Sequence, residues 1–132
     1  MNKDNKKMNA IIILIGNEIL SGRTQDANAA FLSQWLNELG VKVEEVRVIE
    51  DEQEVIVNCI NEVRKKFKYV FTTGGIGPTH DDITSQSIAK AFNLTYGYNK
   101  ETYEILEKYY KPGEFNDSRK KMAKMPDKAS LI

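Results

Sequence analysis

Ala10-Ile-Ile-Ile-Leu-Ile15 is an unbroken run of apolar, mostly β-branched residues that stops at Gly16. Such a run is typical of a strand that is covered on both faces, as strands of parallel sheets usually are. Apolar residues at helical spacing follow it over Asp26–Leu39 and again over Glu52–Phe67. We therefore expect a parallel α/β domain built around this first strand.

The rest of the first 92 residues repeats the order of strand and helix. Val41–Ile49 partly alternates, as expected for a strand nearer an edge with one face in water, and Tyr69–Thr73 is a short strand closed by glycines. A helix is expected from about Asp81 to Phe92. The order β-α-β-α-β-α predicts a three-layer α/β/α sandwich with a mostly parallel sheet.

Two helical stripes are expected to face the core. The apolar residues of the first stripe are Phe31, Leu32, Trp35, Leu36 and Leu39, and Gly40 is a good residue to end that helix. Those of the last stripe are Ile83, Ile88, Ala91 and Phe92.

The pattern changes beyond Asn93. We expect a helix over Asn99–Tyr110, a short basic helix over Phe115–Lys124, and a turn into a strand from Met125. We interpret Met1–Asn9 as a disordered, solvated tail and residues 10–132 as a single domain.

Length and composition exclude several classes of protein. The chain has 132 residues, 41% hydrophobic and 29% charged, with 19 basic and 19 acidic side chains. These fractions are those of a globular protein, and zero net charge provides no electrostatic footprint for general nucleic-acid binding. No apolar run reaches the roughly 20 residues that a membrane-spanning helix needs. One cysteine and one histidine exclude a disulfide framework and a Cys/His zinc site, so we expect a cytoplasmic protein.

The most informative stretch for function is Thr72-Thr-Gly-Gly-Ile-Gly-Pro-Thr-His-Asp-Asp-Ile-Thr84, which lies between a strand and a helix. Open α/β folds bind ligands at this edge of the sheet. Glycines let the backbone approach a ligand, and successive N–H groups beside a helix N-terminus can bind a phosphate or pyrophosphate. The alternative is a tight turn in which Thr79 or Asp81 only caps the helix. The residues expected to bind phosphate are Thr73, Gly74, Gly75, Gly77, Pro78 and Thr79.

Acidic residues lie beside this loop. Asp81 and Asp82 would repel a phosphate unless a divalent cation such as Mg²⁺ lay between them, and Mg²⁺ commonly joins one or two carboxylates to substrate phosphates. Asp51 follows the second strand and could converge with Asp82 at the same edge of the sheet. Alternatively, these acids are solvated and favour the first turns of helices. Glu18 and Asp26 are further candidate ligand contacts, or simply cap turns.

Several motifs in order resemble a known family, the molybdopterin-binding (MoCF, MogA/MoaB-like) domain. The most similar subgroup is the amino-terminal domain of the competence/damage-inducible protein CinA. The resemblance runs from about Ala10 to the end of the chain, including Arg119. The motifs that carry it are Gly16-Asn-Glu-Ile-Leu-Ser-Gly22, Asp26 with Asn28, Asp51, Thr72–Thr84 and Met125-Pro126.

The resemblance implies a three-layer α/β sandwich, often trimeric, and a site for a phosphate-bearing nucleotide or pterin. In MogA-type members the loop that matches Thr73–Gly77 lines the site for the phosphate of molybdopterin. Aspartates matching Asp51 and Asp82 are essential there for Mg²⁺-dependent adenylyl transfer in molybdenum cofactor biosynthesis. CinA-type domains are instead associated with metal-dependent hydrolysis of the pyrophosphate in ADP-ribose, which is the reaction we expect first.

Two departures from the family pattern leave other functions open. Asn17 stands where the first motif usually has an aspartate, and an amide brings no negative charge to a metal. Family members continue after a segment like Met125-Pro126 through a second ligand loop and further strands, so we expect a sheet lacking its C-terminal strands. The rival hypothesis is a catalytically silent remnant that binds a ligand or assembles with a partner.

Several other side chains have two interpretations. His80 is either a general base or an exposed loop residue, whereas Cys59 and the tyrosines of residues 103–110 are expected to pack. Arg119, Lys120, Lys121 and Lys124 could attract a ligand phosphate, but we interpret them as a solvated basic face.

Overall fold

The computed structural model describes residues 8–132. The tail expected at Met1–Asn9 therefore lies largely outside the described residues, and the first strand begins at Asn9. Asn9 joins the structure through its side chain, because its Oδ1 accepts a hydrogen bond of 3.0 Å from the Lys68 N–H.

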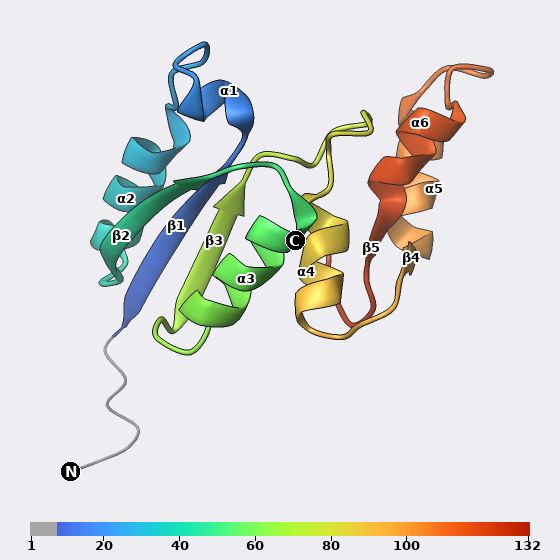
Figure 1. Cartoon of the computed structure of the whole chain (residues 1–132). Coiled ribbons are helices and arrows are strands. Elements are labelled where there is room, and N and C mark those ends of the chain that lie inside the picture. Colours follow the sequence, from blue (N-terminus) through green and yellow to red (C-terminus); the bar gives the residue numbers. More distant parts are fainter. Residues whose placement is uncertain (1–7) are drawn as a thin grey trace.

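The secondary structure alternates strand and helix as far as residue 91 and then changes character (Figure 1). The strands of the first part are β1 (Asn9–Ile15), β2 (Lys42–Ile49) and β3 (Tyr69–Thr73). The helices of the first part are α1 (Asn17–Leu20), α2 (Asn28–Glu38), α3 (Gln53–Val63) and α4 (Thr84–Ala91). The later elements are β4 (Tyr96–Tyr98), α5 (Lys100–Tyr109), α6 (Asp117–Lys120), the 3₁₀ turn η1 (Lys121–Ala123) and β5 (Lys124–Pro126).

The main sheet is parallel, with the order β2-β1-β3. β1 lies in the centre and its residues 10–13 are fully buried, as the unbroken apolar run predicts. β2 alternates between exposed and half-buried residues, which agrees with its place beside water. Figure 1 shows α2 on one face of this sheet and α3 on the other, so the expectation of a parallel sheet flanked by helices is confirmed.

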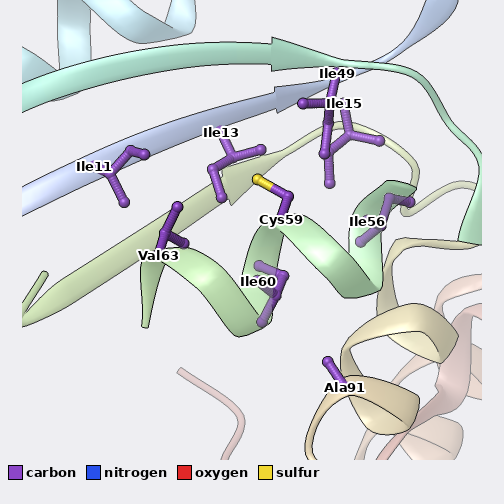
Figure 2. Close-up of a cluster of buried hydrophobic side chains, with 9 residues drawn as sticks. All are labelled: Ile11, Ile13, Ile15, Ile49, Ile56, Cys59, Ile60, Val63 and Ala91. Atoms are coloured by element: carbon purple, nitrogen blue, oxygen red, sulfur yellow. The ribbon is translucent and has the colours of Figure 1, made fainter. Parts of the chain in front are cut away.

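The larger core lies between the sheet and α3 (Figure 2). Alternate residues of β1 point to this side, because side chains of a strand alternate between the two faces of a sheet. They are Ile11, Ile13 and Ile15. From α3 they meet Ile56, Ile60 and Val63, together with Cys59. Burial raises the pKa of the Cys59 thiol, as expected for a core cysteine.

Residues 94–127 build a small second unit beside α4. β4 and β5 pair antiparallel. Asn99 caps α5, because its Oδ1 accepts a hydrogen bond of 2.9 Å from the Thr102 N–H. The expected helix of this region is confirmed, and a basic helical segment precedes β5 as predicted. Strand β4 was not predicted, because Tyr96-Gly97-Tyr98 is too short to show an alternating pattern.

The two predicted helical stripes are each wrong in part. Only Leu36 of the α2 stripe is buried, whereas Phe31, Trp35 and Leu39 are 69%, 49% and 60% exposed. The part of α2 that carries these three side chains is therefore not covered by the sheet. Phe92 is also exposed, and the Arg64 guanidinium lies 4.5 Å from its ring centre.

The two leucines near the end of α2 provide a test of this packing. Leu36→Ala is expected to lower the free energy of unfolding by about 2–3 kcal/mol, because it opens a cavity under the helix. Leu39→Ala removes the same atoms from a mainly exposed side chain and is expected to cost less than about 1 kcal/mol. Urea unfolding of the two variants measures both values, and equal losses would contradict the packing described here.

None of the helices formed by residues 8–132 combines the length and the apolar character that crossing a membrane requires.

Candidate functional site

The glycine loop, residues 73–79, joins the carboxyl end of β3 to the turn before α4. Gly74 and Gly75 have φ angles of +91° and +68°, a conformation that residues with a Cβ rarely adopt. A Cβ at Gly74 would lie 2.1 Å from the carbonyl oxygen of Ile15, and one at Gly75 would lie 2.2 Å from Oγ1 of Thr84. Both glycines are therefore required by the geometry of the loop.

Thr84, the first residue of α4, holds the start of this loop. Its hydroxyl donates a hydrogen bond of 2.8 Å to the Gly74 carbonyl, and its N–H donates one of 3.1 Å to the Gly75 carbonyl. The Thr84 side chain is buried, so these bonds are shielded from competing water. The loop is thus shaped by the protein itself.

Asp82 closes the other end of the loop. Its Oδ2 accepts hydrogen bonds from the N–H and the hydroxyl of Thr79, at 2.9 and 2.8 Å. Partial burial raises the pKa of the Asp82 carboxyl, but the bonds from Thr79, the Gly77 N–H and the charge of Lys121 outweigh it and lower the pKa below its ordinary value. Asp82 is consequently a carboxylate at neutral pH.

Lys121 lies against the same end of the loop, although it comes 39 residues after Asp82. Its ammonium group donates hydrogen bonds to the carbonyls of Thr79 and Asp82, at 2.5 and 2.7 Å. The interpretation of this lysine as part of a solvated basic face is therefore wrong. Lys124, on the same segment, lies with Nζ 5.1 Å from the Tyr98 ring centre.

A small hollow of about 150 Å³ lies between the glycine loop and the segment around Lys121. It is below the range of roughly 300–1,000 Å³ that pockets for whole drug-sized ligands occupy, so it suits one end of a ligand. The residues that line it are Gly75, Ile76, Gly77, Asp82, Ser85, Tyr96, Lys121, Met122, Lys124 and Met125.

Two predicted polar contacts have clear local roles in the structure. Asp26 accepts hydrogen bonds from the N–H groups of Asn28 and Ala29, at 3.3 and 2.8 Å, and so caps the first turn of α2. The Glu18 carboxylate folds back over Gly16, where a Cβ would lie 2.5 Å from its Oε1. Both follow the carboxyl end of β1, the strand next to β3.

The remaining predicted acids are placed separately. The Asp51 N–H lies 3.4 Å from Oδ1 of Asn17, which links the turn after β2 to α1. Asp81 is exposed, and its Oδ1 lies 3.2 Å from Nε2 of exposed His80. Within residues 8–132, no three His, Cys, Asp or Glu side chains come together as a potential metal-binding group. The convergence of Asp51 with Asp82 stays a prediction.

The capping role considered for Thr79 or Asp81 is not what the structure shows. α4 begins at Thr84, three residues later than expected, and is preceded by Ile83. The helix starts late because the bonds between Thr79 and Asp82 fold residues 79–82 into a turn of their own. Pro78 lies in this exposed part of the loop.

Fold and loop together define an α/β domain with a candidate ligand site at the carboxyl edge of a parallel sheet. The family described as "Probable molybdopterin binding domain" matches residues 11–126 of the chain. The protein therefore belongs to this family.

Two curated relatives are similar to most of this chain. A protein of Sulfurisphaera tokodaii is 44% identical over 120 residues, which cover 89% of this chain and 46% of the relative. One of Archaeoglobus fulgidus is 38% identical, covering 95% of this chain and 53% of the relative. The chain thus spans about half the length of the curated relatives it matches.

Solved structures show the same fold. The protein CinA of Thermoplasma acidophilum, described as of unknown function, superposes with a TM-score of 0.85 and 33% identity over 91% of this chain and 71% of that one. The tungsten cofactor synthesizing protein MoaB of Pyrococcus furiosus gives a TM-score of 0.56 at 23% identity, over 79% of this chain and 62% of that one. At this lower identity the similarity concerns the fold alone.

Proposed function

We propose that the glycine loop binds the phosphate of a nucleotide or pterin and that the domain acts on a pyrophosphate bond, with ADP-ribose as the first substrate to test. The observation that carries the proposal is the composition of the hollow. It combines the backbone of Gly75 and Gly77 with the cationic side chains of Lys121 and Lys124. Backbone N–H groups and lysine ammonium groups are common ligands of phosphate.

The Asp82 carboxylate is the group in this hollow that phosphate alone does not explain, because two anions repel each other. A divalent cation between them removes the conflict, and Mg²⁺ is usually held by one or two carboxylates together with substrate phosphates. In this proposal Asp82 would hold the cation, with Asp51 as the second candidate. When bound, the cation would supply charge stabilisation for the leaving phosphate.

Five other residues around the loop also have a task in this proposal. Gly74 and Thr84 hold the loop open toward the ligand, and Thr79 keeps Asp82 ionised and oriented. Lys124 and Lys121 bring positive charge to the bound phosphates. Adenylyl transfer to molybdopterin would use the same groups, so the substrate is decided by experiment. The trimer implied by the family resemblance also stays a prediction.

The first experiment is thermal unfolding of the purified chain with and without Mg²⁺ plus ADP-ribose. A ligand that binds only the native state at 100 times its Kd stabilises it by about 2.7 kcal/mol, so we expect a clear rise of Tm. Mg²⁺ alone and ribose, which lacks phosphate, serve as controls. If ribose raised the Tm as much as ADP-ribose does, the proposal would be contradicted. The same holds if ADP-ribose with Mg²⁺ left the Tm unchanged.

Turnover is measured separately, as release of AMP from ADP-ribose. Stabilisation together with release of AMP supports the pyrophosphatase reaction. Stabilisation without release supports the hypothesis of a silent ligand-binding module.

A further inference from the structure

Residues 121–124, which follow α6 and include Lys121 and Lys124, lie beside the glycine loop although they are distant from it in the sequence. Lys121 belongs to the unit formed by β4, β5 and the helices between them, whereas the loop belongs to the main sheet. Its ammonium group bonds to two carbonyls of the turn that Asp82 closes, those of Thr79 and Asp82. These two bonds connect the unit directly to the loop.

The position of Lys121 is fixed by the backbone before and after it. Oδ1 of Asn116 accepts a hydrogen bond of 3.0 Å from the Arg119 N–H and so caps α6. After η1, buried Ala123 accepts a bond of 2.8 Å from the Asn99 N–H. Because both ends of the segment are held, the lysine side chain emerges at a defined place beside the loop.

The ammonium group also has capacity beyond these bonds. A lysine ammonium carries three N–H donors, and two bonds to carbonyls leave one for a ligand oxygen. Lys121 also lines the hollow, together with Gly75 and Gly77. The group that holds the loop therefore also brings positive charge to the place where an anion would lie.

We propose that Lys121 is a positioning residue that holds the glycine loop in its anion-binding shape and binds the ligand phosphate with its remaining donor. The inference rests on the proposed function, which assigns phosphate to this hollow. It adds that binding depends on the β4–β5 unit as well as on the loop.

The matched pair of variants is Lys121→Met and Lys120→Met. Both remove one positive charge from neighbouring positions. Lys120, however, lies with Nζ 5.9 Å from the Phe115 ring centre and forms no hydrogen bond with the loop within residues 8–132. Amide-resolved hydrogen exchange measures the loop without any ligand. In Lys121→Met we expect at least about tenfold faster exchange at the Thr79 and Asp82 amides, and in Lys120→Met no change.

Titration with inorganic phosphate, followed through the amide signals of Gly75 and Gly77, measures binding. We expect about tenfold weaker affinity in Lys121→Met, little change in Lys120→Met and near-normal affinity in Lys121→Arg, which keeps the charge and the donors. If Lys121→Met does not fold, Lys121→Gln takes its place in both measurements.

The two measurements separate this inference from the proposed function. Unchanged exchange in Lys121→Met, or equal losses of phosphate affinity in the two methionine variants, would overturn the role of Lys121. If the wild-type protein binds no phosphate while Lys121→Met exchanges faster at the loop, the proposed function fails and the holding of the loop by Lys121 is supported.

Discussion

Gly74→Ala is expected to lower the free energy of unfolding by about 2–5 kcal/mol. A φ of +91° costs a residue with a Cβ about 1–2 kcal/mol, and forcing an extra methyl group into a packed position costs about 1–3 kcal/mol more. The second cost applies in full, because the methyl group would meet the backbone carbonyl of Ile15 at 2.1 Å. That carbonyl ends the central strand and has little freedom to move.

Gly113→Ala is the matched control for this prediction. Gly113 has a similar φ of +84°, but a Cβ there would meet nothing within 4 Å in the described part of the chain. Gly113→Ala is expected to lower the free energy of unfolding only by the conformational cost of the positive φ, about 1–2 kcal/mol. Urea unfolding of both variants measures the difference, and losses of equal size would show that the contact with Ile15 does not constrain the loop.

The same substitution also tests the link between fold and site. Any shift that relieves the contact moves the Gly74 carbonyl away from the hydroxyl of Thr84, and this bond helps to shape the loop. Gly74→Ala should therefore weaken phosphate binding even under conditions where most of the protein is still folded. Gly113→Ala should leave it unchanged.

The parts of the fold that the sequence predicts are those determined by local physics. Ala10–Ile15 is apolar throughout, as is typical of a strand covered on both faces. Gly40 has a φ of +81° at the end of α2, and the Asn99 side chain caps α5. Each of these signals depends on a few neighbouring residues.

The parts that were missed depend on contacts between distant segments. The spacing of Phe31, Trp35 and Leu39 shows that they share a face of α2, but it does not show how much of that face the sheet covers. Likewise, charge patterning places Lys121 on a basic segment, whereas its bonds to Thr79 and Asp82 follow from the packing of two units. The glycines of the site were predictable because their backbone requirement is local.

Asp82→Asn is expected to reduce Mg²⁺-dependent hydrolysis of ADP-ribose by about 100–1,000-fold, the loss typical of removing one electrostatic group from a reaction site. The amide keeps the shape of the carboxylate and one oxygen that can accept from Thr79. What it removes is the negative charge that would hold a divalent cation next to the ligand phosphate. The control is Glu38→Gln, which makes the same chemical change at an exposed position at the end of α2.

The pH dependence of stability separates the structural part of this effect from the chemical part. Folding lowers the pKa of Asp82 below its ordinary value of 3.8. The Asp82 charge therefore stabilises the fold above about pH 4, and this contribution is lost as the pH falls through the lowered pKa. Unfolding curves of wild type and Asp82→Asn should therefore differ at pH 7 and converge in acid, whereas Glu38→Gln should follow the wild type throughout. Normal turnover in Asp82→Asn would remove Asp82 from the reaction, even if the stability curves behave as expected. Lost turnover with a folded protein at pH 7 would instead locate the chemistry at this carboxylate, because the loop around it would still be in place.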